Sequence, residues 1–199
     1  VQESEFQTED HWILARLNQV TKEVTQNLEK FELGIALQKI YEFIWEEYCD
    51  WYIEMVKPRL YGDNPAGELE ARYVLVTVLR RAMQLLHPFM PFVTEEIYLN
   101  LPATLAAPAS ASIMVSDWPD RRPEWRNDAV IRQMELVMDA TRQIRNIRVQ
   151  MDVAPSRKVG LIVYTEDDAM AKLFRSGHAY LNHLAGIESI DIRDSKTDI

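Results

Sequence analysis

Apolar residues recur every three or four positions over most of this 199-residue chain, and this spacing limits the fold more than any other feature. It places the apolar side chains on one face of an α-helix, because a helix completes a turn in 3.6 residues. Proline and glycine interrupt the pattern and separate one helix from the next. The pattern predicts five amphipathic helices, whose apolar stripes begin near Ile13, Leu37, Leu69, Val93 and Ile131.

Individual residues mark several helix ends. Thr8 is expected to cap the first helix, since two acidic residues follow it in the first turn. The second helix should end at Pro58, because proline has no backbone N–H to donate. The fifth is expected over 128–149. Residues 102–112 are small, punctuated by proline and of low complexity, so we expect a loop there.

The pattern changes towards the C-terminus. Residues 158–165 are rich in β-branched and aromatic side chains, which predicts a strand. A helix capped by Asp167 or Asp168 should follow and end at Gly186. Residues 187–192 then alternate between apolar and polar side chains, as in a second strand.

These elements predict a mainly α fold with two parts. We expect a helix bundle in residues 1–150 and a small β-α-β appendage in residues 151–199. The net charge is −9, and residues 1–70 alone carry a charge of −9, whereas residues 127–158 carry +2. An acidic chain disfavours general nucleic-acid binding, but its weakly basic middle permits a local anionic partner.

The sequence lacks the patterns of catalytic and metal sites. It contains no glycine-rich phosphate loop, no His-Glu-x-x-His and no Cys-x-x-Cys, so we expect no catalytic residue, metal or cofactor in these residues. Cys49 is the only cysteine, which excludes an internal disulfide and a four-cysteine zinc site. Its acidic and aromatic neighbours should raise the thiol pKa, so an inert, buried cysteine is expected. No apolar run reaches 18 residues, and no transmembrane helix or membrane partner is expected.

Two features stand out from this background, and each has two interpretations. The second predicted helix is dense in aromatic residues, which form either a core or a surface for stacking on exposed bases. The fifth carries arginines three residues apart, which form either a solvated face or a ridge that contacts phosphates. The aromatic residues of the second predicted helix are Phe43, Trp45, Tyr48, Trp51 and Tyr52. The arginines of the fifth are Arg142, Arg145 and Arg148.

Three segments resemble the C-terminal helical domain of class I aminoacyl-tRNA synthetases. They are HWILARLNQV, YEFIWEEYCDWYIEMVKPRLY and LHPFMPFVTEEIY. Within that class, Cys-Asp-Trp-Tyr at 49–52 and His-Pro-Phe-Met-Pro-Phe at 87–92 are similar to the valyl-tRNA synthetases of bacterial type. The resemblance extends from about Asp10 to Val163 and is weaker beyond it.

The resemblance implies a module that recognises the anticodon loop of tRNA-Val. It also implies partner domains, catalytic and editing, in the same cytoplasmic polypeptide, where valine–tRNA ligation uses ATP and Mg²⁺. The His-Ile-Gly-His and Lys-Met-Ser-Lys-Ser signatures of the catalytic domain do not occur in this sequence. The sequence starts at Val1 rather than at methionine, so we expect an excised piece that stops before the family's C-terminal coiled coil. DNA is not an expected partner.

The turn between the first two predicted helices is the expected site of base reading. Lys30 and Phe31 match a basic-plus-Phe pair that stands before the long helix in the family, although relatives often have Arg in place of Lys30. Lysine lacks the bidentate geometry of arginine, which argues against strong base-edge recognition by this side chain. Alternatively, Phe31 is a hydrophobic staple at the start of the second helix.

Two other functions fit the same residues. An isoleucyl-tRNA synthetase module would have the same fold but would prefer a different anticodon. A helical protein-interaction module would fit the acidic first 70 residues and would bind RNA no better than its charge predicts.

Overall fold

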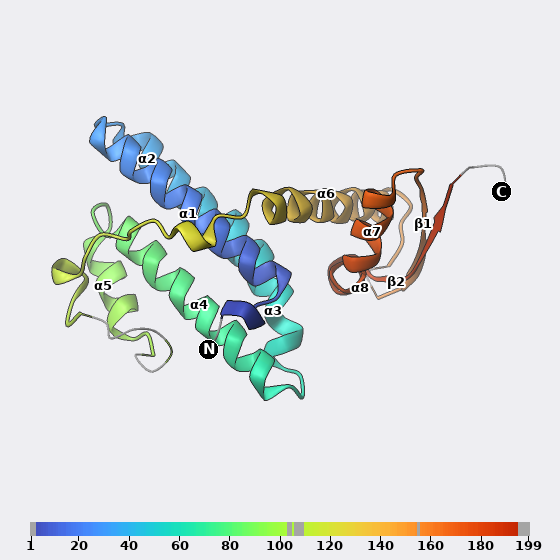
Figure 1. Cartoon of the computed structure of the whole chain (residues 1–199), viewed down its shortest axis with the longest axis horizontal. Helices are drawn as coiled ribbons and strands as arrows, with labels where there is room; N and C mark the ends of the chain where they lie inside the picture. Colours follow the sequence, from blue (N-terminus) through green and yellow to red (C-terminus); the bar gives the residue numbers. More distant parts are fainter. Residues whose placement is uncertain (1–2, 103–104, 106–109, 155, 195–199) are drawn as a thin grey trace. The chain divides into compact units, whose positions relative to one another are not determined.

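The computed structural model describes residues 3–102, 105, 110–154 and 156–194, and its helices dominate the fold as expected (Figure 1). The chain divides into two compact units, Val1–Val130 and Ile131–Ile199. The boundary lies in the first turn of α6 (Asp128–Gln150), the last long helix. The sequence analysis placed the boundary near residue 150, at the other end of this helix. The elements of the first unit are α1 (Thr8–Glu29), α2 (Leu33–Glu42), η2 (Phe43–Tyr52), α3 (Ile53–Leu60), α4 (Pro65–Leu86) and α5 (Pro91–Leu99), together with the short 3-10 turns Glu3–Glu5, Ile113–Val115 and Pro123–Trp125.

The first unit is a bundle in which α1 packs against α2, η2 and α4, while α4 also contacts α3 and α5 (Figure 1). The apolar stripes predicted from the sequence form its core. Trp12, Ile13 and Leu17 of α1 are almost completely buried, as are Tyr52 and Leu85 of the neighbouring helices. Burial of such side chains is the main favourable contribution to folding.

The second predicted helix continues past its expected end. The elements α2, η2 and α3 form one helical run, and η2 is a π-helix in which Ile53 N–H bonds to the carbonyl of Tyr48, five residues back. Pro58 lies inside α3, which ends at Leu60, so the expected stop at Pro58 is wrong. The fixed φ of proline is compatible with helical backbone, and Pro58 lacks one backbone N–H two residues before α3 ends.

The aromatic residues of η2 are mostly core. Phe43, Tyr48, Trp51 and Tyr52 are at least 92% buried, which confirms the core interpretation for these four. Trp45, by contrast, is 53% exposed.

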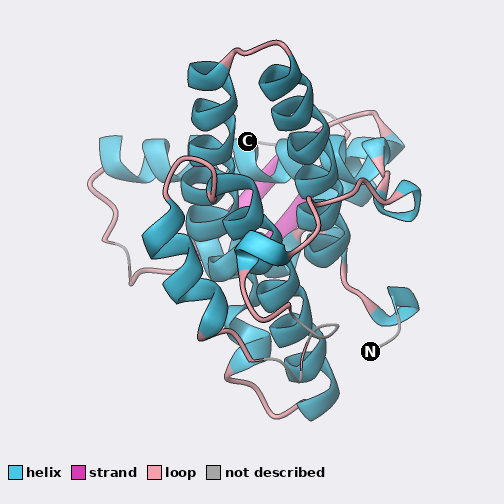
Figure 2. Ribbon diagram, turned by 90° about the vertical axis from the view of Figure 1, so that its left-hand side faces the viewer, coloured by secondary structure: helices cyan, strands magenta, loops and turns pink. Residues whose placement is uncertain are grey.

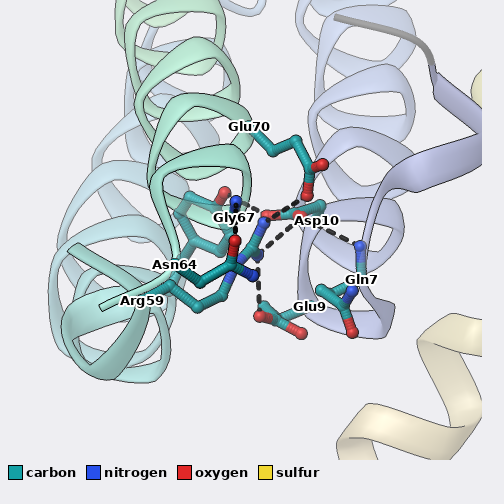
Figure 3. A network of polar contacts seen from close by, with 8 residues as sticks. Gln7, Glu9, Asp10, Arg59, Asn64, Gly67 and Glu70 are labelled. Atoms are coloured by element: carbon teal, nitrogen blue, oxygen red, sulfur yellow. Dashed lines mark hydrogen bonds and ion pairs between the residues drawn. The ribbon is translucent and has the colours of Figure 1, made fainter. Parts of the chain in front are cut away.

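A buried ionic network joins the start of α1 to the end of α3 and the start of α4 (Figure 3). The guanidinium of Arg59 contacts Glu9 at 2.9 Å, Asp10 at 2.7 Å and Glu70 at 3.2 Å. The Tyr52 hydroxyl donates to Asp10 at 2.6 Å. Thr8 is the first helical residue rather than the cap: Gln7 occupies the capping position, and its N–H donates to the Asp10 carboxylate at 3.0 Å.

Residues 113–126 form a strap that lies across α4 and α1 (Figure 1). The indole of Trp118 donates to the Thr25 hydroxyl at 2.9 Å, and Arg122 N–H donates to Asn18 at 2.8 Å. Ile113 and Trp125, at either end of the strap, are buried. The expected loop over 102–112 falls partly outside the described residues.

The second unit carries the predicted β-α-β pattern, with its strands side by side (Figure 2). The strands pair in parallel, and the helices between them cover an apolar core centred on Leu181, Ala185 and Ile187. The elements are α6 (Asp128–Gln150, which begins at the end of the first unit), β1 (Val159–Tyr164), α7 (Asp168–Ser176), α8 (His178–Ala185) and β2 (Ile187–Arg193).

The helix expected between the strands is divided in two at Gly177. A Cβ there would lie 3.2 Å from Cγ2 of Val137 and 3.1 Å from the carbonyl oxygen of Leu173, so close packing favours glycine. Gly186 ends α8 as predicted, with a left-handed φ of 70°. In the described part of the chain, no helix has the length and apolar character needed to span a membrane.

Candidate nucleic-acid interface

The α1–α2 turn is a Schellman motif whose left-handed position is occupied by phenylalanine. Phe31 has φ 60°, and its N–H donates to the carbonyl of Leu28 at 3.0 Å, while Glu32 N–H donates to Asn27 at 2.8 Å. Glycine is the usual residue at this position, because a Cβ in the left-handed region costs about 1–2 kcal/mol. The motif therefore holds a large side chain in a backbone conformation that disfavours it.

The ring of Phe31 projects into solvent. It is 87% exposed, which excludes the alternative that Phe31 is a hydrophobic staple. Lys30, the preceding residue, is also exposed, and α2 begins at Leu33. The turn thus presents an apolar ring, a cation and the partial positive charge of a helix N-terminus within a few residues. A flat ring can stack on an unpaired base, and the two positive groups favour a nearby phosphate.

Exposed apolar side chains continue along α2 and η2 beyond the turn. Leu33, Ile35, Tyr41 and Trp45 are each about half exposed. The rings of Tyr41 and Trp45 lie with their centroids 6.3 Å apart and tilted at 60°. Sequence analysis did not distinguish Tyr41 and Trp45 from the core residues, because one wide apolar stripe contains both groups, and Leu33 and Ile35 precede that stripe.

The three arginines of α6 do not form one exposed ridge. Arg148 is 8% exposed, and its guanidinium donates to the carbonyls of Ala154 at 2.9 Å and Arg157 at 2.7 Å. It ties the end of α6 to the chain before β1, and the expected contact between Arg148 and phosphate does not fit this burial. Three-residue spacing rotates each side chain by about 300°, so the third arginine faces another direction from the first.

Arg142 and Arg145 are exposed, as predicted. Arg142 forms an ion pair with Asp139 at 2.6 Å, one turn earlier on α6. Arg145 Nε donates to the carbonyl of Leu184 at 2.8 Å, near the end of α8. Each guanidinium is a planar cation whose geometry suits phosphate oxygens.

A family model described as the anticodon-binding domain of tRNA ligase matches residues 10–164. The chain belongs to this family. The match begins in the first turn of α1 and continues to the end of β1.

Several proteins that resemble this anticodon-binding domain are named valine–tRNA ligase. The proteins from Clostridium tetani and Clostridium perfringens are each 43% identical to it over 98% of this chain. The protein from Geobacillus stearothermophilus is 44% identical over 86% of the chain. The chain spans about a fifth of the length of these relatives.

The described part of this anticodon-binding domain offers no group of three or more His, Cys, Asp or Glu that could hold a metal ion. Cys49 has a pKa above its ordinary value, because burial and then the negative charge of Asp50 disfavour the thiolate. Both the direction and the influence of an acidic neighbour agree with the prediction from its sequence context, but Cys49 is half-buried rather than buried as expected. A thiol with a raised pKa is a poor nucleophile at neutral pH.

Proposed function

We propose that this chain is the anticodon-reading module of a valyl-tRNA synthetase and binds the anticodon loop of tRNA-Val. It positions the tRNA for ligation of valine by a catalytic domain of the same cytoplasmic polypeptide, which also carries an editing domain. ATP and Mg²⁺ act in that catalytic domain. The family match and the names of the relatives support this proposal.

The exposed Phe31 ring is the observation that carries the proposal. A phenylalanine in solvent contributes nothing to the core, and its left-handed backbone disfavours folding. Stacking on an anticodon base would give the ring a function, with about 1–3 kcal/mol of binding free energy for each stacked base. Lys30 supplies a nearby positive charge for the backbone of the loop.

The exposed arginines of α6 are assigned a smaller role. Arg142 and Arg145 contact tRNA phosphates and strengthen binding without reading sequence. Arg148 acts only on the protein, by positioning the chain that enters β1.

Binding to matched tRNAs tests the proposal. Valine anticodons end in A-C, so the chain should bind tRNA-Val at one fixed low salt concentration and lose affinity when either base is replaced. Preference for the anticodon of tRNA-Ile would favour the isoleucyl alternative. Equal binding to every variant would contradict anticodon reading, and no binding to any RNA would favour a protein-interaction module.

A further inference from the structure

Two rows of exposed side chains run along α2 and η2, one apolar and one acidic. The apolar row consists of Leu37, Tyr41 and Trp45, and the acidic row consists of Glu42, Glu46 and Asp50. Successive members of each row are four positions apart, so they lie on one face of a helix. A π-helix such as η2 has more residues per turn than an α-helix, which keeps positions four apart close to one line.

The apolar row has the chemistry of a protein contact. The side chains of Tyr41 and Trp45 are 58% and 53% exposed, although their rings lie next to each other. Tyrosine and tryptophan are enriched among the residues that dominate binding at protein interfaces, because a large rigid ring buries much apolar area at a low cost in conformational entropy. The apolar row therefore offers two anchors for the apolar side chains of a partner.

The acidic row presents its negative charge to solvent. The nearest cations along the bundle are engaged with other acids, since Lys39 pairs with Glu23 at 2.6 Å and Arg16 pairs with Glu47 at 2.7 Å. Glu42 accepts a hydrogen bond at 2.7 Å from a neutral amide four positions earlier, which leaves its charge uncompensated. Carboxylates in a row repel an RNA backbone and attract lysine and arginine. The acidic row thus opposes the stacking of RNA bases on the neighbouring rings.

We propose that the two rows form a docking surface for an amphipathic helix of another protein chain. The apolar stripe of that helix packs on Tyr41 and Trp45, and its lysines or arginines pair with the acidic row. Charge complementarity selects this occupant, because a basic amphipathic helix carries both kinds of side chain on adjacent faces. The surface is separate from the turn that holds Phe31, and the inference does not depend on the proposed function.

Synthetic peptides test the surface on the full 199-residue chain. The first probe is a helix of about 18 residues, or five turns, with leucine at every third or fourth position and lysine beside this stripe. A second peptide carries glutamate in place of each lysine, and a third has the composition of the first in scrambled order. Titration calorimetry should show that the lysine peptide binds about tenfold or more tightly than either of the others.

Removing a ring tests the apolar row. Tyr41→Ala and Trp45→Ala should each weaken binding of the lysine peptide by about tenfold, because anchor residues carry most of the binding free energy of an interface. Trp45→Phe keeps a ring and should retain most of the affinity. Tyr61→Ala is the matched control, since Tyr61 is 85% exposed at the end of α3 and belongs to neither row. It should leave the affinity unchanged.

Reversing a charge tests the acidic row. Glu42→Lys should weaken binding of the lysine peptide by about fivefold. Combined with Glu46→Lys, it should also strengthen binding of the glutamate peptide. Glu96→Lys is the control, because Glu96 is exposed on α5 and, like Glu42, accepts a hydrogen bond from an amide four positions away. This variant changes the net charge equally and should alter neither affinity.

Four results would overturn the docking surface. The first is equal binding of the lysine peptide and either of the other two peptides. The second is a loss of affinity in Tyr41→Ala no larger than that in Tyr61→Ala, which would place the peptide elsewhere. The third is a loss of tRNA-Val binding in Trp45→Ala as large as that in Phe31→Ala, which would assign the rings to RNA. The fourth is self-association of the chain that Trp45→Ala abolishes, which would assign the surface to a second copy.

Discussion

Two arginine clusters in the helical unit differ in what surrounds their guanidiniums. Arg59 lies among Glu9, Asp10 and Glu70, and each of these carboxylates contacts it directly (Figure 3). Burial by itself lowers the pKa of Arg59, but Asp10 and Glu9 raise it, and the net direction is upwards. Arg81, with Arg80 and Arg122 beside it, has a lowered pKa.

The contrast separates a cation enclosed by carboxylates from a cation that has other cations as neighbours. Around Arg59 the cation satisfies buried acids from two other helices, so its partners lie within the fold. Around Arg81 the charges of Arg122 and Arg80 lower its pKa, Asp120 acts in the opposite direction, and Arg122 itself pairs with Glu124 at 3.6 Å. Net charge conceals this difference, because a chain with a charge of −9 contains both clusters.

Removing Arg59 should have the largest effect on stability. Arg59→Ala leaves buried carboxylates without their cation and should lower the free energy of unfolding by about 3–5 kcal/mol. The same change at Arg80 should cost less than about 1 kcal/mol, because it also removes repulsion. All five tryptophans lie in residues 1–130, so tryptophan fluorescence during urea unfolding reports on this unit. Equal losses in the two variants would contradict the comparison.

Changes at Phe31 should affect binding rather than folding. Phe31→Ala should weaken binding of the anticodon loop by about 1–3 kcal/mol, because a stacking surface is lost. Phe31→Gly should weaken binding by a similar amount and raise the free energy of unfolding by up to about 1 kcal/mol, since glycine tolerates the left-handed position. Titration with tRNA-Val and urea unfolding measure the two effects. Unchanged affinity in folded variants would remove Phe31 from the interface.

Alkaline pH should weaken the buried network through Tyr52. Burial, and then the negative charge of Asp10, raise its pKa well above the ordinary value. The unfolded chain therefore loses this proton near pH 10 while the folded chain keeps it, so the tyrosine contribution is complete below about pH 10 and declines as the pH rises. The expected loss is about 1.4 kcal/mol one pH unit above 10.

Tyr52→Phe should remove the part of the alkaline loss of stability that the Tyr52 hydroxyl causes. Urea unfolding curves between pH 8 and 11 measure this loss. Tyr48→Phe should act in the same direction, because burial and then Cys49 raise the pKa of Tyr48. Parallel stability profiles for both variants and the unaltered chain would show that neither hydroxyl contributes.

Arg145 should produce the smallest effect. Arg145→Ala is expected to reduce the salt slope of tRNA binding by about one without altering anticodon preference. Arg175→Ala, at an exposed position in α7 of the same unit, serves as the control and should leave the slope unchanged. If the two variants behave alike, Arg145 serves only to hold the carbonyl of Leu184.

The sequence alone predicted the helices, the two strands and the raised pKa of Cys49. These depend on local information: helical periodicity, strand composition and the charges of sequence neighbours. The turn at Lys30 and Phe31 was also predicted as the break between two apolar stripes. Local information failed at Pro58, which lies inside α3, and at Gly177, where the single expected helix is divided into α7 and α8.

Only the tertiary structure decided which cations face solvent and which groups gather. Arg148 follows the same three-residue spacing as Arg142, yet it is buried against carbonyls of the chain before β1. Arg81 and Arg122 are 41 positions apart in the sequence, and they meet over Trp125 because the strap crosses α4. Periodicity specifies the face of a helix, but the partner of that face depends on where distant segments pack.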